Sequence, residues 1–167
     1  MAKTIGIGAD KAALELKQIL VEHLKEKGYE VQDYSPPSKE EAQSAGGDYP
    51  DVAVEVAETV ARGEHERTIP VCGTGVGMSI TANKVPGMRA AQGHDVLSTE
   101  RARKSNDAQV LTNDQRVLRP KLAKAVVDAW LESEFGGLVG EEGPEDGRGG
   151  PPIPPGRRDD LLSNPCA

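Results

Sequence analysis

Short apolar runs alternate along this chain with longer segments whose apolar residues recur at helical spacing, as Leu16, Leu20 and Leu24 do. The short runs predict five strands, at residues 4–8, 29–34, 68–72, 88–91 and 109–112. The longer segments predict helices at residues 11–27, 48–62, 76–84, 94–104 and 119–135. Strands that alternate with helices favour parallel pairing through right-handed crossovers. The pattern therefore predicts an α/β fold with a doubly wound sheet.

Three polar or reactive side chains lie at the carboxyl ends of predicted strands, namely Asp10, Cys72 and His94. Ligands of open α/β sheets bind beyond the carboxyl ends of the strands, so we expect a site there. Asp10 is also expected to cap the helix at residues 11–27, and Gly28 to close it.

The composition changes after residue 135, where glycine and proline become frequent. We expect one domain over residues 1–135 and a tail over residues 136–167. The tail's composition is typical of disorder, and packing on a neighbouring subunit is the alternative.

The formal charge of −7 argues against a nucleic-acid surface, which needs a clustered basic face. Two cysteines, Cys72 and Cys166, make a disulfide framework implausible and favour a reducing compartment. We find no apolar run of membrane-spanning length and no leader-like start. The expectation is a cytoplasmic protein that binds neither nucleic acid nor membrane.

The stretch at residues 71–79 combines a strand end, the thiol of Cys72, a glycine-rich turn and a helix start. Glycines let backbone amides approach a ligand closely, and the new helix adds its positive end. Such a place suits a phosphate or an enediolate oxygen, and it also favours a thiolate. The alternative is an inert core thiol beside a simple turn, and the glycine pattern alone does not decide between them.

The surrounding sequence resembles the ribose-5-phosphate isomerase B family, which includes the galactose-6-phosphate isomerase subunits. Residues 72–91 carry most of the resemblance, and residues 8–17, 48–51 and 105–111 add to it. It covers roughly residues 3–135. The resemblance implies a Rossmann-like three-layer fold with a five-stranded parallel sheet, no metal and no cofactor. It also implies a homodimer or homotetramer whose active site lies at the subunit interface.

Matching positions imply the roles of individual residues. Cys72 is the expected catalytic base that removes the proton next to the carbonyl, and Thr74 assists near the substrate oxygens. Asp10 is expected to contact substrate hydroxyls and Arg116 the phosphate. The groups expected to stabilise the enediolate are Asn106 and the amides of Gly73, Gly75 and Gly77.

Two departures from the family pattern bear on the substrate. Lys11 replaces a histidine; it either contacts the phosphate or is simply solvated. Ser105 replaces the histidine that opens the sugar ring, although ring opening needs a general acid–base group. A four-carbon sugar 4-phosphate cannot close that ring, because its C4 oxygen carries the phosphate. Residues 94–106 also resemble the erythrulose-4-phosphate isomerase branch.

Other candidate groups remain open. His94 either replaces the missing ring-opening histidine or is a surface residue at a helix start. His23 and His65 are expected on the surface without a chemical role. A C-terminal arginine-rich segment of the family is missing, and its only replacements are loosely placed, namely Arg148, Arg157 and Arg158.

The leading hypothesis is an aldose–ketose isomerase that interconverts erythrulose 4-phosphate and erythrose 4-phosphate through an enediol. The alternative is isomerisation of ribose 5-phosphate and ribulose 5-phosphate. A non-catalytic sugar-phosphate-binding subunit is less favoured, because Cys72, Thr74 and Asn106 are intact. A nucleotide-binding module is not favoured, since the glycine turn matches neither phosphate-loop pattern.

Overall fold

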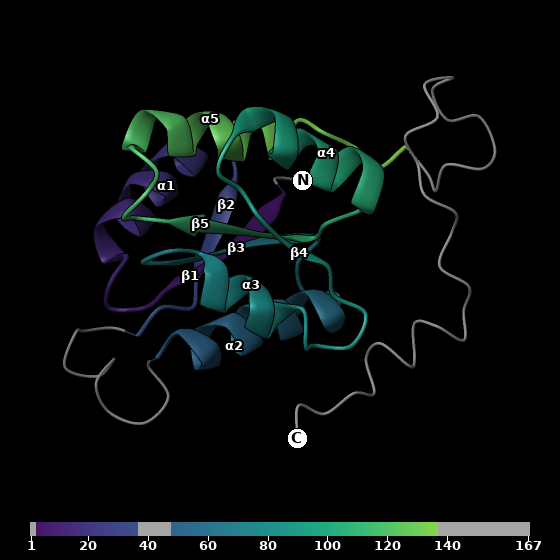
Figure 1. The fold of residues 1–167 in the computed structure, drawn as a ribbon, viewed down its shortest axis with the longest axis horizontal. Helices are drawn as coiled ribbons and strands as arrows, with labels where there is room; N and C mark the ends of the chain where they lie inside the picture. The colour runs from purple at the N-terminus through teal and green to yellow at the C-terminus, as the bar shows by residue number, and fades with distance from the viewer. Residues whose placement is uncertain (1–2, 37–47, 137–167) are drawn as a thin grey trace.

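The computed structural model describes residues 3–36 and 48–136, which form a parallel five-stranded sheet between two layers of helices (Figure 1). The strand order is β2-β1-β3-β5-β4. The strands are β1 (Thr4–Ala9), β2 (Glu30–Asp33), β3 (Arg67–Cys72), β4 (Ala90–Gln92) and β5 (Val110–Asp114). The predicted α/β fold with a Rossmann-like three-layer architecture is confirmed.

The helices divide between the two faces of the sheet. One face carries α1 (Leu14–Glu26), α4 (Val96–Asn106) and α5 (Pro120–Leu131), and the other carries α2 (Tyr49–Ala61) and α3 (Val76–Ala82) (Figure 1). The chain changes direction across the sheet between β1 and β3, which pair side by side. Such a switch point leaves a crevice at the carboxyl ends of the two strands.

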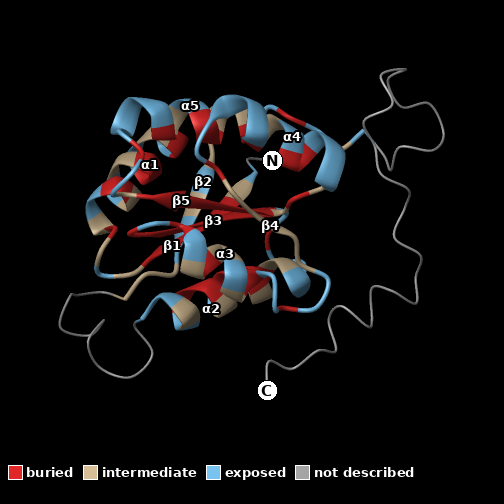
Figure 2. Ribbon diagram, viewed as in Figure 1, coloured by how far each residue is buried: buried red, intermediate tan, exposed pale blue. Residues whose placement is uncertain are grey.

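The central strands are buried from both sides, as their red colour in Figure 2 shows. The larger core lies between the sheet and the α1/α5 layer and includes Leu20, Leu24 and Trp130, all fully buried. A smaller cluster under α2 joins Val52, Val56 and Met78 to Cys72. The catalytic thiol expected from the sequence is therefore also part of a packed apolar layer.

The start of α1 differs from the prediction. The helix begins at Leu14, not residue 11, and Asp10 is not its cap. Instead the Asp10 carboxylate accepts the Ala12 N–H over 3.0 Å, and its carbonyl accepts the Ala13 N–H over 3.1 Å. This turn satisfies the Asp10 carbonyl locally and delays the helix by three residues. Gly28, with φ +86°, follows the helix end as expected.

The end of α5 also differs, since the helix stops at Leu131 and not at residue 135. The buried guanidinium of Arg67 donates to the carbonyls of Trp130 and Leu131, both over 2.9 Å. Arg67 lies 63 and 64 positions before these two residues in the chain. Because its guanidinium supplies their hydrogen-bond donor, the two carbonyls do not need N–H groups from a further helical turn.

The expectation that His23 and His65 are surface residues was wrong. His65 is 8% exposed, and its Nε2 lies 2.7 Å from the hydroxyl of Tyr34. His23 lies 2.7 Å from Asp128, between α1 and α5. Both side chains bridge elements distant in sequence, a role that local pattern does not reveal.

The expected tail from residue 137 onward lies outside the described residues, as do Arg148, Arg157, Arg158 and Cys166. Across residues 3–36 and 48–136, no helix combines the length and apolarity required to cross a membrane.

Candidate active site

The carboxyl ends of β1, β3, β4 and β5 bring most of the sequence-predicted site residues to one edge of the sheet. Asp10 and Lys11 follow β1, Cys72 ends β3, His94 follows β4, and Arg116 follows β5. The register sets Cys72 directly beside Asp114. The structure therefore gathers around the glycine turn residues that are up to 106 positions apart in the chain.

The glycine turn folds back on the thiol. Cys72 is 5% exposed, and its sulfur accepts a hydrogen bond from the Gly75 N–H over 3.1 Å. Gly75 has φ +74°, a left-handed conformation that glycine adopts without steric cost. The helix α3 that starts at Val76 has only seven residues. The positive potential beside the turn therefore comes from individual N–H groups more than from a helix macrodipole.

Three successive carbonyls of this turn are held on its rear side. The Gln115 N–H donates to the Cys72 carbonyl and the Arg116 N–H donates to the Gly73 carbonyl, each over 3.0 Å. The side-chain amide of Gln92 donates to the Thr74 carbonyl. Because C=O and N–H point in opposite directions across a trans peptide, these bonds turn the N–H groups of residues 73–75 toward the opposite side.

Gly77 makes room for a neighbour that we did not single out from the sequence. A methyl group at Gly77 would lie 2.5 Å from the ring of Tyr49, at the start of α2. The Tyr49 side chain is 43% exposed and lies over this helix turn. It provides an aromatic wall beside the glycine turn. The sequence could have indicated Tyr49, because it follows Asp48 within a motif that matches the family.

Charged groups frame the other side of the turn. The Arg116 side chain passes over Gly73, with Nε 3.2 Å from where a Cβ would sit. Lys11 Nζ lies 3.7 Å from the Asp48 carboxylate. Burial raises the pKa of Asp10 above its ordinary value, and the Asp48 carboxylate adds to this, while the Ala12 N–H, Lys11 and Arg116 oppose it. Arg116 and Lys11 suit a phosphate, and Asp10 suits the hydroxyls of a sugar.

His94 lies at the same edge, in contact with a residue that sequence reasoning missed. Its Nε2 is 2.7 Å from the carboxylate of Asp114, a fully buried residue. The other Asp114 oxygen accepts the N–H groups of Val117 and Leu118. His94 thus has a fixed carboxylate partner, although its own side chain is 44% exposed.

Asn106 is not brought beside Cys72 within one chain. It ends α4, and its carbonyl accepts from Arg89 just before β4, so it lies at the amino ends of the strands. Asn106 precedes Val110 by four residues, and Val110 pairs with Thr68, four residues before Cys72. At 3.3 Å per strand residue, Asn106 and Cys72 are separated by at least roughly 13 Å along the strand direction. Ser105 lies at the same distant edge.

A family comparison decides what this edge belongs to. The model of the family described as Ribose/Galactose Isomerase matches residues 5–142. The chain belongs to this family. The resemblance expected from residues 72–91 is confirmed, and so is the enzyme class: the chain is a sugar-phosphate isomerase.

Individual members of the Ribose/Galactose Isomerase family are similar over most of their length. The D-erythrulose-4-phosphate isomerase of Pectobacterium atrosepticum is 50% identical over 135 residues, which cover 80% of this chain and 86% of that protein. The ribose-5-P isomerase B of Listeria innocua is 47% identical, with 80% and 86% covered. The solved structure of Clostridium thermocellum ribose-5-phosphate isomerase B is 44% identical in sequence and has a TM-score of 0.74. The match covers 80% of this chain and 87% of that one.

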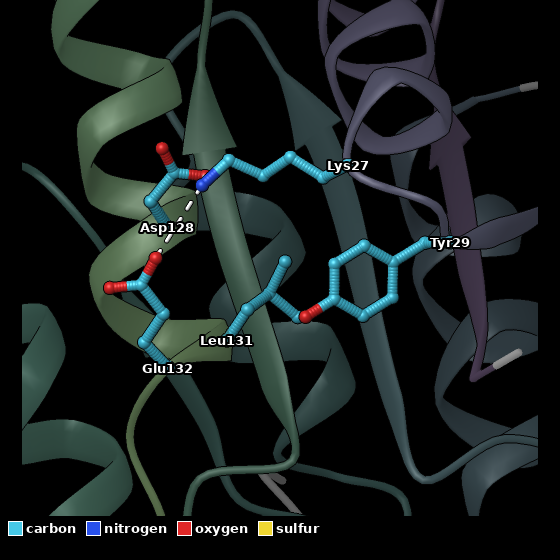
Figure 3. Close-up of a pocket in the computed structure, with 5 residues that line it drawn as sticks. All are labelled: Lys27, Tyr29, Asp128, Leu131 and Glu132. Carbon is cyan, nitrogen blue, oxygen red and sulfur yellow. Dashed lines mark hydrogen bonds and ion pairs between the residues drawn. The ribbon is translucent and has the colours of Figure 1, made fainter.

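A separate hollow lies at the opposite edge of this family fold and takes no part in the site. It has a volume of about 270 Å³ and is lined by Lys27, Tyr29, Asp128, Leu131 and Glu132 (Figure 3). Lys27 spans it, with Nζ 2.9 Å from Asp128 and 3.4 Å from Glu132. These ion pairs join the end of α1 to α5.

Proposed function

We propose that this chain interconverts D-erythrulose 4-phosphate and D-erythrose 4-phosphate through a cis-enediol, with Cys72 as the base. The observation that carries the proposal is the Cys72 sulfur under the Gly75 N–H, at the edge where Asp10 and Arg116 converge. A thiolate there has an N–H donor to stabilise it and faces groups suited to a sugar and its phosphate.

The reaction needs a proton to move between adjacent carbons. Arg116 and Lys11 hold the phosphate, and Asp10 holds a hydroxyl group. The Cys72 thiolate removes a proton from the carbon next to the carbonyl, and the electron pair shifts onto the carbonyl oxygen. Amides of the glycine turn stabilise the charge that develops there. Cys72 then returns the proton to the former carbonyl carbon, while the hydroxyl proton passes between the two oxygens with help from Thr74.

The tetrose substrate is favoured by Ser105. Its hydroxyl is a weak acid–base group for opening a furanose ring, whereas a tetrose 4-phosphate has no such ring to open. The similarity to the Pectobacterium atrosepticum D-erythrulose-4-phosphate isomerase supports this substrate. Loss of a histidine at position 105 has no chemical consequence for a substrate that is already acyclic.

Ribose 5-phosphate is the alternative substrate, and one observation favours it. His94 lies at the same edge as Cys72, next to the buried Asp114 carboxylate, where an imidazole could open a ring. The Listeria innocua ribose-5-P isomerase B is nearly as similar to this chain as the erythrulose relative is. The two substrates differ in their need for a ring-opening group, so kinetics separate them.

A second copy of the chain completes the proposed site. Asn106 is too far from Cys72 within one chain to act on the same substrate, so it would reach the site of a partner copy. Exposed apolar side chains near the glycine turn and the start of α4 offer a surface for pairing, namely Val76, Ile80, Val96 and Leu97. The proposal is therefore a homodimer or homotetramer with its active site at the subunit interface, and we place it in the cytoplasm, as its cysteine content favours.

The direct test is conversion of erythrulose 4-phosphate to erythrose 4-phosphate, followed by proton NMR. Cys72→Ser should lower the rate by about 10²–10⁴-fold, the usual contribution of a general base. Cys166→Ser, which removes the other cysteine, should keep the parental rate. Full turnover by a folded Cys72→Ser protein would show that another group moves the proton.

A further inference from the structure

The peptide between Thr74 and Gly75 joins the site to β4. Its N–H side donates to the Cys72 sulfur over 3.1 Å, and its carbonyl side accepts from the Gln92 amide. A peptide unit is planar and trans, so rotation about its axis moves both groups together. Whatever fixes the Thr74 carbonyl therefore also aims the Gly75 N–H at the sulfur.

Gln92 is the side chain that fixes this carbonyl. It ends β4, is half-buried, and lies across Gly75, with Nε2 3.0 Å and Cγ 3.3 Å from where a Cβ would sit. The glycine at position 75 is thus needed for its left-handed backbone and for the space that Gln92 occupies. An amide reaching this carbonyl has the donor that a hydrocarbon side chain lacks.

His94 limits the movement of the Gln92 amide on its far side. The Gln92 Nε2 lies 2.9 Å from His94 Nε2, which is itself 2.7 Å from Asp114. The two hydrogens of the Gln92 amide nitrogen can therefore be donated to the Thr74 carbonyl and to the His94 ring nitrogen, which accepts in that tautomer. The Gln92 amide rests between His94 and the Thr74 carbonyl.

We propose that Gln92 is a positioning residue that orients the Thr74–Gly75 peptide and so stabilises the Cys72 thiolate. The inference rests on the proposed role of Cys72 for its effect on turnover. The orientation itself can be measured on the free protein without substrate. In catalysis, Gln92 acts only through the peptide.

Other ionisable groups surround the thiol and must stay unchanged in a test. They are Asp10 after β1, Tyr34 after β2, His94 after β4, and Asp114 and Arg116 at and after the end of β5. Replacing Gln92 by an uncharged residue leaves all of them in place. The variant Gln92→Met keeps a side chain of similar length and removes the amide group, including the N–H donor.

The experiment is the rate of Cys72 alkylation by iodoacetamide against pH, in a Cys166→Ser background so that one thiol is followed. In Gln92→Met the pH of half-maximal rate should rise by about half to one unit, as expected for loss of one hydrogen bond to the thiolate. Gln92→Glu should raise it further, because a carboxylate repels the Thr74 carbonyl. Gln18→Met, on the exposed face of α1, is the matched control and should leave the profile unchanged.

Turnover gives the second readout. Gln92→Met should lower kcat about 3–10-fold with little change in KM, since the base is affected and the substrate contacts are not. A folded Gln92→Met protein with the alkylation profile of the Gln18→Met control would overturn the inference. A shifted profile together with full turnover by Cys72→Ser would instead uphold the positioning and reject Cys72 as the base.

Discussion

The N–H of Gly75 and the sulfur of Cys72 lie 3.1 Å apart at the end of β3. An N–H donor aimed at the sulfur suits a negatively charged acceptor. The Cys72 side chain also packs against Val56 and Met78. The proposed role of Cys72 as the base therefore depends on the orientation of the Gly75 N–H, which the glycine turn sets.

Mixed dimers test whether Asn106 acts across a subunit interface. Cys72→Ser and Asn106→Ala should each be inactive as homodimers. In a heterodimer of the two, one site has both native residues, so a purified heterodimer should recover about half of the parental activity, as a two-fold interface requires. Differently tagged chains, co-expressed and purified over both tags, allow the measurement.

If Asn106 instead serves its own chain, every site of that heterodimer carries one substitution. The heterodimer would then be as inactive as the two homodimers. A mixture of Cys72→Ser with Gln18→Met chains serves as the control for pairing itself, since its dimers have one intact site under either arrangement.

Asp10 should make the protein less stable as its carboxyl ionises. Burial is the main cause of its raised pKa, so the folded chain binds this proton more tightly than the unfolded chain does. The contribution of Asp10 to the free energy of unfolding is thus highest below its ordinary pKa of 3.8. It falls as the pH rises through the pKa that Asp10 has in the folded protein. Asp10→Asn should raise Tm at pH 7 by about 1–3 °C while lowering turnover.

The Tm advantage of Asp10→Asn should fade below pH 4, where the native carboxyl is also neutral. Asp51→Asn is the control, because Asp51 lies in the first turn of α2, where a negative charge is favourable. It should not raise Tm at pH 7. A pH-independent difference between Asp10→Asn and the parent would show that burial of the charge is not the cause.

Arg67 should be important for stability although it lies far from the site. Replacing it by methionine leaves the Trp130 and Leu131 carbonyls without their donor inside the protein. The expected loss is about 3 kcal/mol in the free energy of unfolding, measured by urea titration. Arg62→Met removes an exposed arginine that pairs with Glu58 and Glu64, and should change little. Equal losses in both variants would contradict the helix-end role of Arg67.

The sequence was most informative where function depends on residues close together in the chain. The five strands, their parallel pairing and the Cys72 glycine turn follow from local periodicity and a contiguous motif. The delayed start of α1 did not, because the Asp10 carboxylate competes with the helix for nearby N–H groups.

Residues that act through long-range contacts were missed for a physical reason. Gln92 and Asp114 are separated from Cys72 by 20 and 42 positions. The pairing of β5 with β3 sets Asp114 beside Cys72, and the pairing of β4 with β5 adds Gln92. His65 was expected on the surface because its partner Tyr34 follows β2, 31 positions earlier in the chain. Asn106 was assigned to the site from a motif, and the motif carries no information on which copy of the chain it serves.

The measurement that tests the central claim most directly is kcat/KM of the purified protein for erythrulose 4-phosphate and for ribose 5-phosphate, side by side. An acyclic substrate predicts a preference for the tetrose of about a hundredfold or more, equivalent to about 2.7 kcal/mol of transition-state discrimination. Equal values, or a preference for the pentose, would contradict the tetrose assignment and make His94 the ring-opening group.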